Sequence, residues 1–297
     1  MDHHILTITF SVAFYAAIGI SYNLVAGHGG MLSLSHATYV GVGAYVTAML
    51  VSFRQFSYGI AVPAGLLVAA CVGVLFSWAA YRLRDDTWTV ATLGFHLLFL
   101  DIVSNLEGLT NGMQGIGVSR TPSFLANVSH TQTRLMLSVG ACLVVLASTA
   151  VVAQSAFGRV LRASREDEVF VRTTGIQTGI VRGTAVVTAG ILAALVGCIY
   201  GPAFRMVKPE NFALTESLLV VGIVMVGGLA THWGPIVGAI ILVGFPEVLR
   251  LSLNLPASLE ANFRKLFFGV ALVALVWLRP QGVLNGYHLS SSRNSQR

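Results

Sequence analysis

Charged side chains are scarce in this sequence. Asp, Glu, Lys and Arg make up only 10% of the 297 residues, against about 25% in ordinary soluble domains. Apolar residues reach 55%, and the mean hydropathy is +0.76. A soluble core cannot hide so much apolar surface, because a large part of any folded chain stays on the outside. The composition therefore predicts that lipid is the solvent for most of the chain.

Lysine is also rare, and the motifs of common enzymes are missing. Lys208 and Lys265 do not fit the G-x-x-x-x-G-K-[ST] pattern, whose lysine reaches the β- and γ-phosphates of a nucleotide. The patterns HExxH, GxSxG and CxxC do not occur either. Cys71, Cys142 and Cys198 lie singly in apolar runs, without metal or disulfide spacing. We therefore expect no enzyme activity, no metal and no cofactor in this chain, so that any ATP would be bound by partner subunits.

The basic residues border the apolar runs instead of forming a stripe. The net charge is +6, but no run of basic residues with interleaved aromatics appears, which excludes nucleic acid as a partner. The positive-inside rule of membrane proteins explains these arginines more simply.

Apolar runs recur along the chain at lengths close to the roughly 20 residues that a spanning helix needs. Two are ambiguous: the run 215–230 is short, and 88–105 contains His96 and Asp101. Either could be a half-helix or a re-entrant segment, which is tolerated only where protein or water surrounds it. We expect an all-α polytopic integral membrane protein with eight to ten transmembrane helices, including broken or re-entrant ones. The candidate spans are 5–26, 34–53, 58–81, 88–105, 134–153, 183–204, 215–230, 235–251 and 262–278.

The charges that do occur gather in one internal segment, FGRVLRASREDEVFVRTTGI, residues 157–176. Between Gly158 and Gly175 we expect one short helix, with ion pairs at i+3 or i+4 such as Arg165 with Glu168. A solvated loop would need only positive charge. Consecutive acids and exposed apolar residues instead favour a surface that docks a soluble protein. The residues concerned are Arg159, Arg162, Arg165, Glu166, Asp167, Glu168, Phe170 and Arg172.

The distribution of arginine also predicts orientation. The loop 154–182 and the tail after Arg279 are rich in arginine, which places both in the cytoplasm. With nine spans the N-terminus then lies outside. The longest connection on the outer side is 106–133. We expect it to form, together with 204–215, a surface that receives a partner protein outside the membrane.

Small and polar residues within the spans give further expectations. Gly197 with Gly201, and Gly234 with Gly238, are small-xxx-small pairs that allow helix backbones to approach closely in lipid. The stretches 27–30 and 227–234 resemble each other weakly, like a broken-helix element repeated in two halves of a transporter. No buried mid-membrane carboxylate stands out, and this argues against a proton-coupled carrier.

Four stretches together resemble the permease subunit of branched-chain amino acid ABC importers, within a superfamily that also contains ribose-type sugar permeases. They are YNLVAGHGGMLSLSHATYVGVGAY (22–45), TWTVATLGFHLLFLDIVSNLEGLTNGMQGI (87–116), the charged segment 157–176 and GGLATHWGPIVGAIILVGFPEVLR (227–250). The resemblance covers about residues 5–282. It departs from the importers' EAA pattern, because Val169 and Phe170 follow Glu168, and His28 replaces a small or aromatic residue.

The resemblance implies a permease domain at 1–285, a cytoplasmic polar tail at 286–297 and a multi-pass protein of the bacterial inner membrane. Its partners would be membrane lipid, a second permease subunit, two ABC ATPases and an extracytoplasmic substrate-binding protein. The loop 154–182 would couple the chain to the ATPases, with Gly175 among its residues. Candidates for the translocation path are Asn23, Ser33, His36, Thr92 and His96.

The substrate implied is a branched-chain or other hydrophobic amino acid. Urea, short amides or sugars remain open within ABC importers. Two other classes also remain open: a stand-alone secondary carrier or channel, and a membrane-embedded enzyme or assembly factor.

Overall fold

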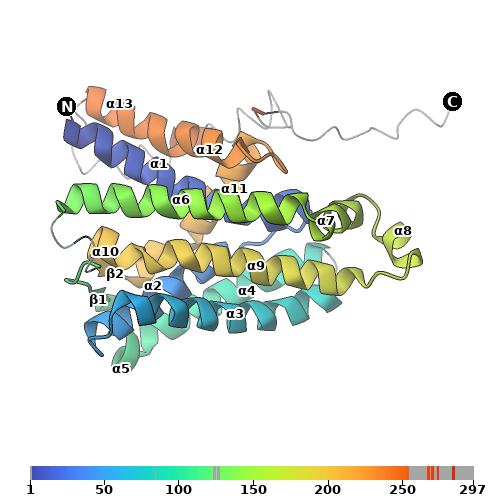
Figure 1. The fold of residues 1–297 in the computed structure, drawn as a ribbon, viewed down its shortest axis with the longest axis horizontal. Coiled ribbons are helices and arrows are strands. Elements are labelled where there is room, and N and C mark those ends of the chain that lie inside the picture. Colours follow the sequence, from blue (N-terminus) through green and yellow to red (C-terminus); the bar gives the residue numbers. More distant parts are fainter. Residues whose placement is uncertain are drawn as a thin grey trace.

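The structure is a computed structural model that describes residues 2–83, 85–122, 125, 128–253, 266–267, 269–270, 273 and 283–284. It is a bundle of roughly antiparallel helices (Figure 1). Within the described residues, six helical segments are long and apolar enough to cross a membrane. They contain α1 (Asp2–Asn23), α3 (Tyr58–Arg82), α4 (Asp85–Asn105), α6 (His130–Gln154), α9 (Thr178–Cys198) and α11 (Leu214–Gly227).

Two further apolar helices are shorter. The helix α2 (His36–Ser52) has 17 residues, and α12 (Gly234–Ala239), the π-turn η5 (Ile240–Gly244) and α13 (Phe245–Leu253) follow one another directly. These eight segments correspond to the first eight predicted spans. The ninth, 262–278, falls mostly outside the described residues, so the count of eight to ten helices stays a prediction.

The structure resolves the two ambiguous runs differently. The helix α4 is continuous over 21 residues, so 88–105 is not a half-helix. The helix α11 is short, with 14 residues, and ends where Gly228 takes φ 116°. Irregular backbone also precedes α2: a π-turn, η1 (Leu24–His28), ends the first span, and residues 29–35 re-enter the bundle. Met31, Ser33 and Ser35 of this stretch are buried, whereas Gly30 and Leu32 are exposed. Much of this irregular backbone is therefore enclosed by protein, as non-helical backbone at membrane depth has to be.

Small residues allow α2, α3 and α9 to pack with their backbones close together. A methyl group added to Gly197 of α9 would overlap with the Val40 carbonyl of α2, and one on Gly43 would overlap with the Ala194 carbonyl of α9. Gly238 is equally close to the Ile223 carbonyl of α11. The predicted small-residue packing is confirmed for Gly197 and Gly238. In contrast, apolar side chains such as Leu67, Leu75 and Val90 are exposed on the outer surface, as lipid-facing residues are.

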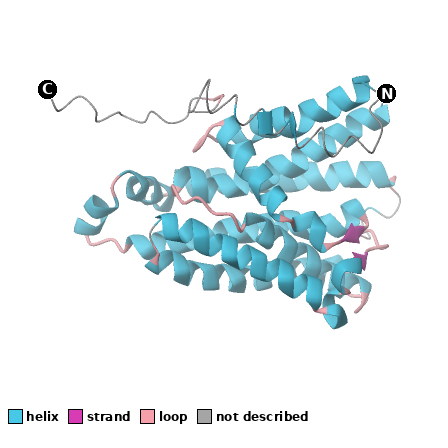
Figure 2. Cartoon of the chain, turned by 180° about the vertical axis from the view of Figure 1, so that it is seen from behind, coloured by secondary structure: helices cyan, strands magenta, loops and turns pink. Residues whose placement is uncertain are grey.

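A two-stranded antiparallel sheet closes one end of the bundle (Figure 2). Ile116 of β1 (Ile116–Gly117) pairs with Val207 of β2 (Met206–Val207), so the predicted outer segments 106–133 and 204–215 do lie together. The helix α1 begins at this same end (Figure 1). Short elements complete the strand end: α5 (Glu107–Thr110), η2 (Gly112–Gln114), α10 (Tyr200–Phe204) and η4 (Pro209–Phe212).

The helices α7 (Ala156–Glu166) and α8 (Glu168–Thr173) project from the opposite end of the bundle (Figures 1 and 2). The backbone N–H groups of Val283 and Leu284 donate to the carbonyls of Val226 and Gly227, at the end of α11 that lies on this side. The N-terminal end of α1 and the charged segment are therefore at opposite ends, as the arginine distribution predicts. The chain at 283–284 is at the same end as the charged segment.

Candidate functional site

The charged segment forms two short helices where the sequence predicted one. The Ser155 hydroxyl caps α7 by accepting from the Gly158 N–H at 3.3 Å. Asp167 has extended backbone angles (φ −148°, ψ 96°), and its carboxylate accepts the Phe170 N–H at 2.9 Å. An Asp side chain that bonds the N–H three residues later is a standard helix N-cap. Asp167 therefore ends one helix and starts the next, so its place in the acidic run has a local structural reason.

Glu168 fastens α8 to the bundle. Its carboxylate forms ion pairs with Arg172, at 2.7 Å, and with Arg182 of α9, at 3.4 Å. The Thr178 hydroxyl also donates to it at 2.9 Å. The sequence placed Arg182 in the loop and paired Glu168 with Arg165. Both expectations are wrong, because α9 begins at Thr178 and carries Arg182, nearly buried, into reach of Glu168.

Two large apolar side chains are exposed on the outer face of this helical hairpin, among charged residues. Val169 and Phe170 are 72% and 65% exposed, respectively, whereas Leu161 and Val171 are buried against the bundle. Gly175 takes φ 85°, a conformation that favours glycine, just before the chain returns to α9. Phe170 and Val169 are neighbouring apolar side chains on a helix that ion pairs hold against the bundle. Such a pair is suited to become buried in the interface with a partner protein.

The inner face of α7 contacts the loop that follows α1. The Arg165 guanidinium donates to the carbonyl of Gly27, and its side chain lies over Gly30, which takes φ 69° and has no room for a Cβ. Leu161 lies beside Gly29. The segment 27–30 is therefore in direct contact with α7. The helix α8, which carries the exposed apolar pair, follows α7 directly in the chain.

The same loop is bonded to the segment between α11 and α12. Asn23 donates to the Thr231 carbonyl at 2.9 Å and accepts the Ala230 N–H at 3.0 Å. The rings of His28 and His232 are 6.0 Å apart. The two stretches that resemble each other in sequence are thus in contact, and contacts run continuously from α7 through 27–30 to 228–233.

A buried polar junction lies where the re-entrant stretch 29–35 meets α2 and α4. The Ser33 and Ser35 hydroxyls are 3.1 Å apart, and the Leu34 N–H donates to the Thr92 hydroxyl at 3.0 Å. His36 Nε2 is hydrogen-bonded to the Ser21 hydroxyl at 2.8 Å. The Ser33 N–H also donates, to the Tyr22 hydroxyl at 3.3 Å. The side-chain hydroxyls of Thr92 and Tyr22 satisfy backbone N–H groups that have no helical partner, which is what irregular backbone inside a bundle requires.

His96 lies on α4 at the edge of this junction. Its Nδ1 is 3.0 Å from the Thr38 hydroxyl, and its ring is fully buried. Nε2 has no hydrogen-bond partner among the described residues. A buried polar atom without a partner costs free energy, so this ring has the capacity for one further hydrogen bond.

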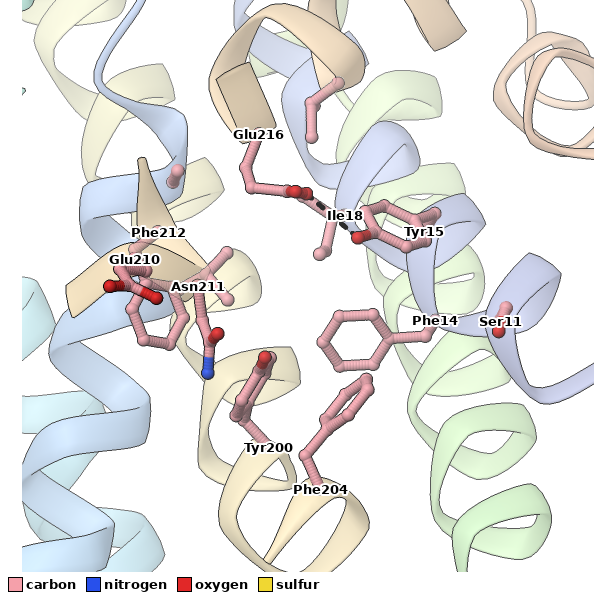
Figure 3. A pocket seen from close by; sticks show the side chains of 13 residues that line it. Ser11, Phe14, Tyr15, Ile18, Tyr200, Phe204, Glu210, Asn211, Phe212 and Glu216 are labelled. Carbon is pink, nitrogen blue, oxygen red and sulfur yellow. Dashed lines mark hydrogen bonds between the residues drawn. The ribbon is translucent and has the colours of Figure 1, made fainter. Parts of the chain in front are cut away.

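A cavity of about 360 Å³ lies near the strand end, between α1, α10, η4 and the first turn of α11 (Figure 3). Aromatic rings of Phe14, Tyr200 and Phe204 form one side of it. The Glu216 carboxylate lies on the opposite side and accepts the Tyr15 hydroxyl at 2.9 Å. The sequence alone did not single out Glu216 or this cavity. The available signal was an acid two residues into an apolar run.

The structure thus gathers the predicted residues into two groups. The coupling residues all lie on or beside α7 and α8. The path candidates are all buried: Asn23 ends α1, Ser33 precedes α2, His36 begins it, and Thr92 and His96 lie within α4. The cavity of Figure 3 is lined by neither group. The functional roles of both groups stay predictions.

The fastening of α8 yields a first prediction. Glu168→Gln should loosen α8, because it weakens two ion pairs, one of them with the nearly buried Arg182. We expect trypsin to cleave after Arg172 at least severalfold faster than in the wild-type protein, since cleavage follows local opening. Glu166→Gln is the matched control, because Glu166 is exposed on the neighbouring helix. Equal cleavage rates for both variants would mean that Glu168 does not hold α8.

Comparison with known proteins places the chain in a family. The profile described as "Branched-chain amino acid transport system / permease component" matches residues 4–276. The permease protein LivM of Salmonella typhimurium is 27% identical over 91% of this chain and 67% of the relative. LivH of Escherichia coli is 25% identical over 91% of both chains.

One relative whose name gives a different role matches over less of the chain. The autoinducer 2 import system permease protein LsrC of Yersinia enterocolitica is 29% identical, over 62% of this chain and 50% of the relative. No solved structure matches. The family match covers the six apolar helices, the charged segment and most of the chain between them. This chain therefore belongs to the branched-chain amino acid transport permease family.

Proposed function

We propose that the chain is the membrane-spanning permease subunit of an ABC importer and forms half of the translocation path for branched-chain or other hydrophobic amino acids. Family membership over residues 4–276 is the observation that carries this proposal. ATP would be bound and hydrolysed by two separate ATPase subunits. A second permease subunit would complete the path, and an extracytoplasmic protein would deliver the substrate.

The projecting hairpin supports a division of labour between this chain and a motor. The apolar pair Val169 and Phe170 faces away from the bundle, while Leu161 and Arg165 touch the loop 27–30. A partner that binds the outer face and changes shape with ATP would therefore move α7 against the re-entrant loops. The permease equilibrium shifts only as far as the partner's affinities for the two states differ.

The decisive experiment is transport by the assembled complex. The chain is co-expressed with its neighbouring second permease, ATPases and binding protein, and the complex is reconstituted in liposomes. We expect leucine uptake that requires both ATP inside and binding protein outside. Uptake by this chain alone, without ATPases, would identify a secondary carrier and overturn the proposal.

The distant similarity to an autoinducer 2 permease favours one alternative cargo, a small sugar-like molecule. In the same liposomes, ribose-type sugars and leucine are compared with their own candidate binding proteins. Saturable ATP-driven uptake of a sugar, without uptake of leucine, would keep the importer and replace the substrate.

Orientation provides a second prediction. Cysteine at Gln177, which is exposed beside α8, should resist a membrane-impermeant thiol reagent added to intact cells. Cysteine at Arg54, exposed at the strand end, should react. Both variants are made in a background without Cys71, Cys142 and Cys198. The reversed pattern would place the hairpin outside and exclude its contact with cytoplasmic ATPases.

A further inference from the structure

The cavity of Figure 3 has a one-sided chemistry. Among its charged lining residues are two carboxylates, Glu216 and Glu210, and no lining residue is basic. Glu210 is exposed and lies on η4, at the rim. Glu216 is half-buried in the first turn of α11, and its side chain extends into the space in front of α1. An anionic ligand would be repelled here, whereas a cation would be attracted.

The position of Glu216 is set by its surroundings. Its Oε2 accepts the Tyr15 hydroxyl at 2.9 Å, which draws the carboxylate toward α1 and leaves its other oxygen for a second donor. An ammonium group offers three donors in a compact charge, and bonds between charged partners are shorter and stronger than neutral ones. The carboxylate is therefore oriented before any ligand arrives.

The wall opposite Glu216 suits an apolar body. The rings of Tyr200 and Phe204 stack at 4.3 Å, and Phe14 meets them edge-on at 5.8 and 5.6 Å. The Arg134 guanidinium already lies 5.5 Å from the Phe204 centroid, so the attraction of a ring face for a ligand's cation is left to Phe14 and Tyr200. The cavity volume of about 360 Å³ is at the lower end of the 300–1,000 Å³ typical of small-molecule sites. A ligand with a primary ammonium group and a small apolar side chain fits both walls.

One more lining residue fits the third part of such a ligand. The Asn211 side-chain amide comes from η4 and is held by a single long bond to the Met206 carbonyl, at 3.5 Å. In Figure 3 it lies between Glu216 and Tyr200. A neutral amide can donate to a carboxylate without the pull of a full positive charge. The site therefore accepts a zwitterion but favours its ammonium end.

We propose that this cavity is a substrate-binding site of the permease chain, in which Glu216 pairs with the ammonium group of an amino acid and the Phe14, Tyr200 and Phe204 rings contact its apolar side chain. The proposal rests on the proposed function and assigns its substrate contact. The helix α10, whose residues line the cavity, lies at the strand end of the bundle, opposite α7 and α8 (Figure 1). A binding protein outside the membrane would release its cargo at this end.

The test uses the assembled importer in liposomes with Glu216→Gln, which keeps the shape of the side chain and an acceptor for Tyr15. We expect uptake of leucine to fall about tenfold or more, because a hydrogen bond to a charged group is lost. ATPase activity stimulated by the binding protein should persist, since α7 and α8 are untouched. Asp101→Asn is the matched control, because Asp101 is an exposed acid on α4 that does not line the cavity.

Ligand chemistry is tested directly, without the binding protein. Ser11, which lines the cavity, is replaced by cysteine in a background free of the native cysteines, and its rate of thiol modification is measured in the assembled importer. Leucine and 3-methylbutylamine should slow the reaction, whereas 4-methylpentanoate, which lacks the ammonium group, should not. Adding Glu216→Gln should remove this protection.

The outcomes separate the two proposals. An importer that carries a sugar and not leucine overturns the proposed function. An importer that carries leucine, but equally well with Glu216→Gln and without protection at position 11, overturns the substrate site alone. Protection by 4-methylpentanoate as strong as that by leucine would mean an apolar or lipid pocket and would also overturn the site.

Discussion

Replacing Phe170 with Asp should release the ATPase subunits from the importer while the permease still inserts and folds. The ring is 65% exposed, so its loss removes little from the core of this chain. In a complex, an aromatic side chain at the centre of a contact is a typical hot spot, worth about 2 kcal/mol or more. A carboxylate at the same point would also lose its water on docking.

Such a loss weakens binding by about 30-fold, since about 1.4 kcal/mol corresponds to a factor of ten. The measurements are co-purification of the ATPases with the tagged permease and ATP-driven leucine uptake. Phe53→Asp is the matched control, because Phe53 is 54% exposed just after α2, at the strand end of the bundle and far from the hairpin. Full co-purification and normal uptake with Phe170→Asp would reduce the hairpin to a connector between helices.

Arg159→Ala should have a smaller effect. Its guanidinium donates to the Gln154 carbonyl on the exposed side of α7, so it is a rim charge and not part of the apolar face. Rim charges mainly change the association rate and its salt dependence. We therefore expect ATPase binding that is nearly normal at low salt and weaker at high salt, measured by association kinetics at two ionic strengths.

The helical segments were predictable from sequence because their signal is local. Runs of about 20 apolar residues read directly as spans, and the structure places helices at the first eight of them. The boundaries were less accurate where polar residues lie inside a helix. Arg182 was assigned to a loop on its charge alone, whereas its side chain is buried in α9 beside Glu168. The Arg182 charge is paired with a carboxylate on a different helix, α8, and the local sequence does not reveal such a partner.

The hairpin shows the same limit in another form. The sequence favoured a partner for the acids at 166–168, yet the structure gives Asp167 a capping role and Glu168 ion pairs within the chain. The exposed apolar pair Val169 and Phe170 is therefore the feature that favours docking of a partner. The cavity was missed altogether, because Tyr15 and Glu216 are 201 positions apart. Local sequence patterns cannot predict a hydrogen bond between two residues that are so far apart in the chain.

Close backbone packing at Gly197 was predicted from glycine spacing, but its partner helix α2 was not. The sequence grouped Gly197 with Gly201, as if one pair served one contact. In the structure Gly197 faces the Val40 carbonyl of α2, and Gly201 faces the Val118 side chain instead. Gly43 of α2 faces the Ala194 carbonyl in return. Two helices thus each supply a glycine to the other's backbone, which is the closest approach that helices in lipid make.

Gly197→Val should therefore prevent α2 and α9 from packing and abolish recovery of folded protein. Its Cβ would overlap a backbone carbonyl, which cannot rotate away as a side chain can. Overpacking against adaptable side chains costs about 1–3 kcal/mol, and α2 would here have to shift as a whole. That shift would disturb the polar junction at Ser33, Ser35 and His36, because all three residues precede or begin α2.

The measurement is the yield of monodisperse protein in detergent, together with its thermal unfolding midpoint. Gly140→Val is the matched control, since Gly140 on α6 has open space where a Cβ would be placed. That variant should be recovered at wild-type yield. Gly197→Ala should lie between the two, because it adds the overlapping Cβ without the two methyl groups. If Gly197→Val and Gly140→Val had the same thermal unfolding midpoint, the backbones of α2 and α9 would have to be farther apart than the structure places them. The position of the polar junction would then not depend on the contact between these two helices.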